Sequence, residues 1–173
     1  MAADPISVRS ATPEDVGTIL AFIRELAEYE RLSHAVVATE ASLADALFGD
    51  APAAEVLIAE VAGVPAGFAL FFQNFSTFLA RRGVYLEDLY VRPSHRRLGV
   101  GRALLTRLAA LTVARQCGRM EWNVLDWNES ARRFYEGLGA EPLSDWTTYR
   151  LAGHGLVALG AQAPDSAADG GSR

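Results

Sequence analysis

The sequence is that of an acidic chain of ordinary domain size, with 173 residues, 50% of them hydrophobic, and a formal net charge of -5 at pH 7. This length favours one domain with its own core over two full domains. The excess of acidic over basic residues argues against a general nucleic-acid-binding protein. Because the sequence has neither a run of about 18 apolar residues nor a signal-peptide pattern, we expect a cytoplasmic protein that does not bind membranes.

One cysteine and three histidines limit the metal and redox chemistry. Cys117 alone excludes an internal disulfide, and we interpret it as a buried structural thiol. The scattered histidines do not supply the ligands of a structural zinc ion, so we expect no metal.

Two helix patterns open the chain. Thr12-Pro13-Glu14-Asp15 combines a capping hydroxyl, a proline at the first helical position and acids in the first turn, and apolar residues then recur at helical spacing. We expect a helix from there to about Arg31. A shorter helix is expected over Glu40–Phe48, between Thr39 and Gly49.

The hydrophobic period then changes to that of strands. Residues 54–62 and 67–75 flank the turn residues 63–66 and predict a hairpin of mostly buried strands. The remaining expected elements are a strand over 83–92, a helix over 101–115, and strands over 119–125 and 146–151. Hairpins followed by a strand–helix–strand unit predict a mixed α/β sheet with helices on both faces.

The last part of the chain contains one more helix and a polar tail. Asn128 is a helix-cap candidate, followed by apolar residues on one face and a stop at Gly139. We therefore expect one domain over residues 1–159. The small, polar, Gly/Pro-rich residues 160–173 predict a disordered C-terminal tail.

A basic, glycine-containing loop separates an expected strand from the helix that follows it. Arg96-x-x-Gly99-x-Gly101 lies at this junction, where unpaired helix amides and the helix dipole favour an anion and where glycine lets the anion approach the backbone. Neighbouring arginines add charge that suits a pyrophosphate. The alternatives are a solvated basic loop and a tight structural turn, and spacing alone does not decide among the three.

Two better-known phosphate motifs do not fit this loop. Gly99-x-Gly101-x-x-Leu104 imitates a dinucleotide fingerprint with Asp126 as the ribose acid, but leucine replaces the third glycine and the loop does not open the fold. A Walker loop is excluded because no Gly-Lys-Ser/Thr follows the glycines.

At this point the sequence resembles the GNAT acetyltransferases, whose pyrophosphate loop is written Arg/Gln-x-x-Gly-x-Gly/Ala. Tyr85-Leu86-Glu87-Asp88, Trp127-Asn128-Glu129 and Phe134-Tyr135 are similar to the spermidine/spermine (diamine) and thialysine acetyltransferase branch. The resemblance covers about Ile6 to Leu151. It implies a GNAT-like, mixed and mostly antiparallel sheet of six or seven strands flanked by about four helices, with acetyl-CoA as co-substrate.

The resemblance also implies which residues form the site. Tyr135 would stand beside the thioester sulfur. Those on the cofactor side are Leu89, Tyr90, Val91, Arg96, Arg97, Leu98, Gly99, Val100, Gly101, Arg102, Asn128, Ser130 and Ala131. Those on the amine side are Tyr29, Glu30, Glu87, Glu121, Trp122 and Asn123. Leu138, where polyamine enzymes carry a basic residue, and Glu121, where a histidine is expected, depart from the branch and weaken a polyamine assignment.

Acetyl transfer to an amine needs a base and an acid. A lysine-like ammonium has a pKa near 10.4, so its deprotonation at pH 7 costs roughly 4.6 kcal/mol. Glu87 is our candidate base and ammonium anchor, preferred to Asp88 because strand alternation places the two acids on opposite faces; pairing with a loop arginine is the alternative. Tyr135 is the candidate acid for the departing thiolate, or else a core aromatic.

The resulting prediction is a homodimeric N-acetyltransferase that acts on a diamine, polyamine or lysine analogue by direct attack in a ternary complex. Tyr29 and Glu30 would hold the cationic substrate, or else form a solvated helix end. Alternative functions are acetylation of an amino acid, an antibiotic-like amine or a protein amine, and a non-catalytic acyl-CoA sensor.

Overall fold

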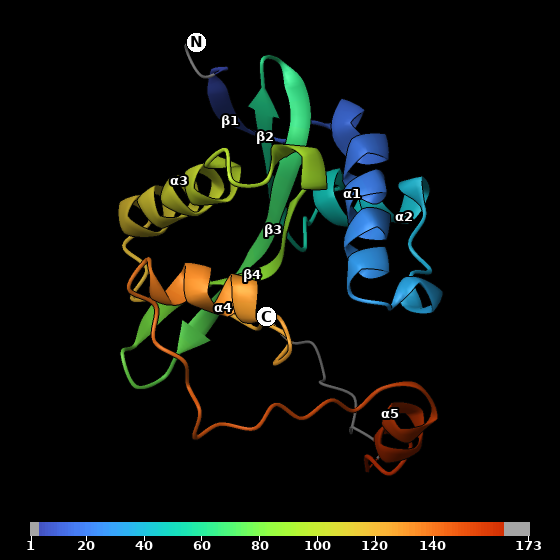
Figure 1. Ribbon diagram of the computed structural model, residues 1–173. Coiled ribbons are helices and arrows are strands. Elements are labelled where there is room, and N and C mark those ends of the chain that lie inside the picture. The colour runs from blue at the N-terminus through green and yellow to red at the C-terminus, as the bar shows by residue number, and fades with distance from the viewer. Residues whose placement is uncertain (1–3, 165–173) are drawn as a thin grey trace, which may run out of the picture. The chain divides into compact units, whose positions relative to one another are not determined.

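The computed structural model of the protein describes residues 4–164 (Figure 1). The chain divides into two compact units, Met1–Asn123 and Val124–Arg173, and each is described by itself. The single domain expected over residues 1–159 stays a prediction. Most of the expected tail, residues 165–173, lies outside the described residues.

The first unit is built on a five-stranded sheet in the order β1-β2-β3-β4-β5. Neighbouring strands are antiparallel except β4 and β5, which are parallel. The mixed, mostly antiparallel sheet is therefore confirmed, with five strands among the described residues in place of six or seven. The strands are β1 Ile6–Ser10, β2 Glu55–Val61, β3 Val64–Ser76, β4 Arg81–Val91 and β5 Met120–Trp122.

Two strand assignments differ from the expectations. β1 was not predicted, because its five residues are too few to show a clear period. The strand expected over residues 146–151 is irregular chain in the structure, since β-propensity alone does not supply the neighbouring strand that the backbone must pair with. The predicted hairpin is confirmed, but its turn is shorter than the expected residues 63–66. The turn consists of Ala62 and Gly63, both in the left-handed region with φ of 50° and 78°.

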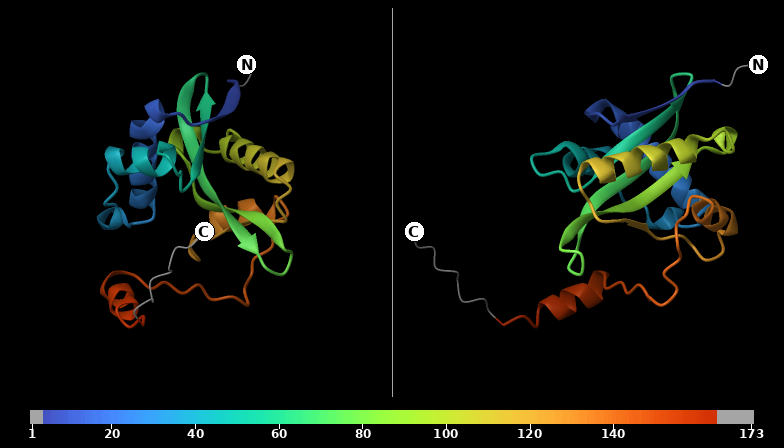
Figure 2. Two further views of the ribbon diagram at one scale, coloured as in Figure 1. Left: turned by 180° about the vertical axis from the view of Figure 1, so that it is seen from behind. Right: turned by 90° about the vertical axis from the view of Figure 1, so that its left-hand side faces the viewer.

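Helices cover both faces of the sheet, as expected (Figures 1 and 2). α1 (Val16–Tyr29) and α2 (Glu40–Phe48) lie on one face, and α3 (Val100–Ala114) lies on the other. Phe22 of α1 stacks on Phe68 of β3 with ring centroids 5.4 Å apart, in the centre of the core. Short 3-10 turns occupy Pro13–Asp15, Ser33–Ala35 and Pro93–His95.

The second unit contains α4 (Glu129–Glu136) and α5 (Gly153–Gly160). The predicted cap of α4 is confirmed, because Asn128 Oδ1 accepts from the Ala131 amide at 3.2 Å. The helix ends at Glu136, before the expected stop at Gly139, which takes up a left-handed φ of 88°. α5 was not predicted from its glycine-rich sequence.

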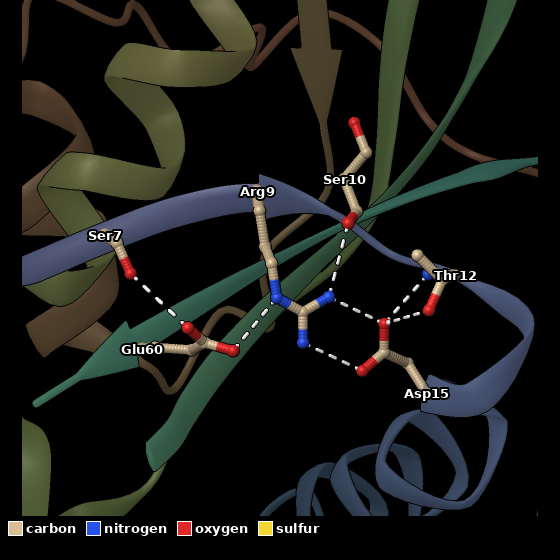
Figure 3. Close-up of polar contacts among 6 residues, drawn as sticks. All are labelled: Ser7, Arg9, Ser10, Thr12, Asp15 and Glu60. Carbon is tan, nitrogen blue, oxygen red and sulfur yellow. Dashed lines mark hydrogen bonds and ion pairs between the residues drawn. The ribbon is translucent and has the colours of Figure 1, made fainter. Parts of the chain in front are cut away.

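A polar network fastens β1 to β2 and to the start of α1 (Figure 3). The Arg9 guanidinium bonds the two oxygens of Asp15 at 2.7 and 2.9 Å and Glu60 at 2.9 Å, while the Thr12 amide donates to Asp15 at 2.8 Å. The hydrogen bonds from Arg9 lower the pKa of the buried Asp15 to about 2. Burial alone would raise this pKa, so the hydrogen bonds outweigh it. The network therefore stabilises the fold only while Asp15 is ionised.

Replacing Asp15 by asparagine is expected to lower the free energy of unfolding by about 1–2 kcal/mol at pH 7, a value reduced because the Arg9 side chain is 39% exposed to solvent. The folded pKa lies below the ordinary one, so this stabilisation is present above pH 4 and is lost as the pH falls toward 2. Urea unfolding at pH 7 and pH 3 measures the effect, with Glu28→Gln on the exposed face of α1 as control. If Asp15→Asn lowers the free energy of unfolding equally at both pH values, the expectation is wrong.

Candidate active site

The loop between β4 and α3 exposes the amides of a helix N-terminus. Gly99 is the N-cap with a left-handed φ of 95°, and its carbonyl accepts the first hydrogen bond of the helix, from the Ala103 amide at 2.9 Å. In the part of the chain that the structure describes, the amides of residues 99–102 donate to no protein acceptor. Because the helix dipole adds positive potential, this end of α3 is a suitable binding site for an anion.

The arginines of this loop do not all face the same way. Arg97 and Arg102 are exposed beside the free amides, and Arg97 has a left-handed φ of 62° that few side-chain-bearing residues adopt. The Arg96 guanidinium instead lies 4.7 Å from the centre of the Tyr29 ring, and its Nε donates to the Val91 carbonyl at 3.0 Å. Among the three exposed arginines of the predicted anion site, Arg96 is therefore the one with contacts to Tyr29 and to the β4 backbone.

A β-bulge interrupts β4 at Glu87. Leu86 pairs with Phe71 of β3, but Asp88 pairs with Leu70, so Glu87 is the extra residue. Since Leu70 and Phe71 are consecutive in their strand, their partners Leu86 and Asp88 lie on opposite faces of the sheet. Our use of strict alternation to prefer Glu87 over Asp88 is therefore wrong at this point in the strand.

Beyond the bulge, the outer edge of β4 turns backbone groups away from β3, and one of them, the Val91 carbonyl, accepts from Arg96 Nε. The Arg92 amide donates to Ala66 of β3 at 2.9 Å, so by alternation the backbone groups of Leu89 and Val91 face away from β3. On that side β5 pairs only with residues 84–86 of β4. The Leu89 and Val91 backbone groups therefore point away from β3, and their assignment to the cofactor side stays a prediction.

Three carboxylates from two elements influence one another near the bulge. The pKa of Asp88 is raised to about 6, chiefly by burial and then by the charges of Glu87 and Glu30. Burial also raises the pKa of Glu30, which follows the last residue of α1. Glu30 and Glu87 thus both act on Asp88, the carboxylate that sequence reasoning had set aside, while their assignment to the amine side stays a prediction.

The residues of β5 serve a different local network. Glu121 forms an ion pair with Arg119 at 2.8 Å and accepts from the Asn74 amide nitrogen at 3.2 Å. Its charge is compensated within the sheet, which distinguishes it from the three carboxylates near the bulge. Trp122 is half-buried opposite Leu86, and Asn123 directly after the strand is exposed.

Four of the expected site residues belong to α4 and its cap in the second unit. Asn128, Ala131 and Tyr135 follow one another at spacings of three and four residues, so they share one face of the helix. The Tyr135 ring is half-buried and lies 5.4 Å from that of Phe134. Ser130 is exposed beside this face.

The described residues contain neither a metal-binding cluster nor a membrane-spanning helix. Within residues 4–164, no group of three His, Cys, Asp or Glu side chains is arranged to hold a metal ion. No helix in that range is long and apolar enough to span a membrane. Cys117 is half-buried, with its Sγ 3.9 Å from the Arg115 carbonyl, so its interpretation as a fully buried thiol is wrong.

Residues 19–140 match the acetyltransferase (GNAT) family. The chain is 36% identical to an L-ornithine N5-acetyltransferase of Arabidopsis thaliana over 88% of this chain and 86% of that protein. It is 35% identical to the thialysine N-epsilon-acetyltransferase of Bos taurus, over 89% and 96% of the two chains. A solved integron cassette protein from V. cholerae has a TM-score of 0.76 at 25% identity and covers 91% of this chain and 98% of that one. The chain therefore belongs to the GNAT family and is an N-acetyltransferase.

Proposed function

We propose that the protein transfers the acetyl group of acetyl-CoA to the primary amine of a small cationic substrate, by direct attack in a ternary complex. The observation that carries the proposal is the outward-facing edge of β4 next to the free amides that begin α3. A pantetheine arm has amides that can bond a free strand edge, and a diphosphate suits a helix N-terminus. Acetyl-CoA is a ligand that carries both groups.

Backbone groups and charged side chains would both hold the cofactor. The amides of residues 99–102 and the arginine side chains of the loop would bind the pyrophosphate, while the Leu89 and Val91 backbone would bond the pantetheine arm. The arginines are Arg96, Arg97 and Arg102. Asn128, Ser130 and Ala131 of α4 would complete this side, as the family resemblance implies. Bound acetyl-CoA supplies an activated acyl group with a thiolate as its leaving group.

The carboxylates near the bulge would bind the substrate and accept its proton. Glu30, Glu87 and Asp88 together present negative charge to an ammonium group. We keep Glu87 as a base candidate and add Asp88, since a pKa of about 6 is closer to that of a base working near neutral pH. Relatives named for ornithine and thialysine support a diamine or lysine analogue as acceptor.

Tyr135 would return a proton to the departing thiolate. A phenol with a pKa near 10 can protonate a thiolate whose acid has a pKa near 8.5, provided that the hydroxyl is well placed. The C–N bond forms as the C–S bond breaks, and the ammonium gives up two protons: one would leave through the carboxylates, and the other, lost after the attack, would restore the proton that Tyr135 gave to the thiolate. The step then balances without a covalent enzyme intermediate.

We also propose that the enzyme is a homodimer. The second unit carries large apolar side chains that are not buried against their own unit, with Trp146 75% and Tyr149 91% exposed. Further exposed members of this segment are Leu143, Leu151, Leu156, Val157 and Leu159. A second copy of the chain would offer a strand edge to residues 146–151, which have the composition of a strand, and would cover this apolar surface.

Two measurements on the full chain test the proposed function. Calorimetry with coenzyme A tests the cofactor site, and thiol release from acetyl-CoA across diamines, lysine analogues, amino acids and peptides tests the acceptor. We expect binding, and release that is fastest with an acceptor carrying a second cationic group. If coenzyme A does not bind, the proposal fails; if it binds but no amine releases thiol, the chain is a sensor.

Replacing Gly99 by valine is expected to raise the Kd for coenzyme A at least about tenfold, because a β-branched residue at this left-handed φ costs about 1–3 kcal/mol and moves the amides. Gly63→Val is the matched control, since Gly63 has a similar φ of 78° but lies in the β2–β3 turn. Calorimetry gives both Kd values. Equal affinities for the two variants would contradict an anion site at α3.

A further inference from the structure

Arg119 and Glu121 form an ion pair that two residues of β3 fix in place. Arg119 Nε lies 2.8 Å from Glu121 Oε2, and the side-chain nitrogen of Asn74 donates to the same oxygen at 3.2 Å. Arg119 Nη1 also donates to the hydroxyl of the buried Ser76 at 3.2 Å. Because both charged side chains are half-buried and bonded on two sides, the pair has a defined position on the sheet.

The neighbouring residue shows which face of the sheet Glu121 occupies. Met120 faces α3, because its Sδ accepts from the Thr112 hydroxyl of that helix at 3.9 Å. Successive side chains of a strand point to opposite faces. Glu121 therefore lies on the other face, which α1 and α2 cover (Figure 2).

Asp88 lies on the same face as Glu121. Asp88 pairs with Leu70 of β3. Tyr85 pairs with Phe72 of β3 and with Glu121 of β5. Leu70 and Phe72 are two residues apart in one strand, so they and the residues paired with them share one face. Two residues along a strand and one strand spacing then separate the Cα atoms of Asp88 and Glu121 by about 8 Å.

The two ends of this surface differ in charge. At one end, the carboxylates of Glu87 and Glu30 act on Asp88. At the other end, the guanidinium of Arg119 compensates the carboxylate of Glu121. An acceptor bound along this face therefore meets negative charge near Asp88 and a neutral ion pair about 8 Å away, within the length of an extended triamine.

We propose that Arg119 is a specificity-determining residue for the amine acceptor. It supplies from within the protein the cation that Glu121 would otherwise bind on the substrate. The site thus favours an acceptor with two amino groups over a longer polyamine, whose next ammonium would lie beside the guanidinium. This inference rests on the proposed acetyl transfer to an amine.

Two single substitutions should change acceptor selectivity in opposite directions. Arg119→Gln leaves Glu121 unpaired, so the ratio of kcat/KM for spermidine to that for putrescine should rise about two- to five-fold, the effect of a partly exposed charge pair. Glu121→Gln leaves the guanidinium unpaired, so this ratio should fall. The ratio for ornithine, which is putrescine with an added carboxylate, should then rise. Steady-state thiol release from acetyl-CoA gives each kcat/KM.

The double variant Arg119→Gln/Glu121→Gln separates an effect of charge from a loss of structure. It is neutral at this position, as the ion pair is, so both ratios should return to within about twofold of the wild-type values. Arg119→Lys, which keeps the charge, should also keep these ratios. Thermal unfolding of each variant shows whether folded protein is being compared.

Arg115→Gln is the matched control for the loss of an ion pair. Arg115 pairs with Glu55 at 2.6 Å, and its guanidinium lies 5.9 Å from the centre of the Phe71 ring. Phe71 follows Leu70 in β3 and so lies on the face opposite to Asp88. Removing this guanidinium should leave both selectivity ratios unchanged.

The outcomes separate this inference from the proposed function. If folded Arg119→Gln has the wild-type ratios, or if the double variant keeps the change of either single variant, the inference is wrong. An equal change in Arg115→Gln would show a general effect of charge and would also overturn it. If Arg119→Gln does not fold, Glu121→Gln and the double variant decide between the same outcomes. Failure of the wild type itself to bind coenzyme A or to acetylate any amine removes the proposed function, on which the inference rests.

Discussion

Replacing Tyr135 by phenylalanine is expected to lower kcat by about 10²–10⁴-fold, the range that a positioned general acid contributes. The phenylalanine ring keeps the packing against Phe134 but has no proton to give to the thiolate. The Kd for coenzyme A should therefore change little. Steady-state thiol release and calorimetry give the two quantities.

Tyr149→Phe is the matched control for this change. Tyr149 is also in the second unit but is 91% exposed, so removing its hydroxyl should leave kcat unchanged. A Tyr135→Phe enzyme with wild-type kcat would show that Tyr135 is only a packed aromatic. In that case thiolate protonation by solvent would suffice, and the role of α4 would be limited to binding.

The helices of the first unit could be predicted because their signals are local. The cap and first turn before α1, the Thr39 cap of α2 and the glycines before α3 each act within a few residues. The free amides at the start of α3 were predictable for the same reason, because the first amides of any helix have no intrahelical acceptor. These features needed no knowledge of the tertiary fold.

The features that sequence reasoning missed depend on which strands pair. The bulge at Glu87 exists only through the register between β4 and β3, and nothing in Leu86-Glu87-Asp88 marks the extra residue. The bulge changes the face on which Asp88 lies and the direction of the Leu89 and Val91 backbone. Asp88 could therefore not be assigned from alternation.

The dependence on strand pairing also explains why the structure of the last part of the chain differs from the prediction. Residues 146–151 have the composition of a strand, but a strand needs a partner edge, and composition does not say where that edge is. α5 combines helix-weakening glycines with apolar residues such as Leu156 and Val157, so its local propensities conflict. In both segments the local signal alone does not decide the structure.

Replacing Asp88 by asparagine is expected to lower kcat/KM for the amine by about 10²-fold or more, through loss of a proton acceptor and of substrate charge. In the wild type, kcat/KM should rise with pH through about 6, where Asp88 ionises, and this rise should disappear in the variant. Glu28→Gln, on the exposed face of α1, is the control and should keep the wild-type profile. A pH profile of Asp88→Asn identical to that of the wild type would exclude Asp88 as the titrating group.

The same substitution is expected to stabilise the fold, which a purely structural carboxylate would not do. The folded pKa of about 6 lies above the ordinary 3.8, so the folded state binds the proton more tightly and stability falls as the pH rises from about 4 to 6. Above pH 6 the ionised Asp88 therefore weakens the fold, and Asp88→Asn should gain about 1–2 kcal/mol at pH 7, with little gain at pH 4. Urea unfolding at both pH values measures this difference. A destabilised variant at pH 7 would mean that Asp88 forms a favourable pair in the fold and is not a charge held for the substrate.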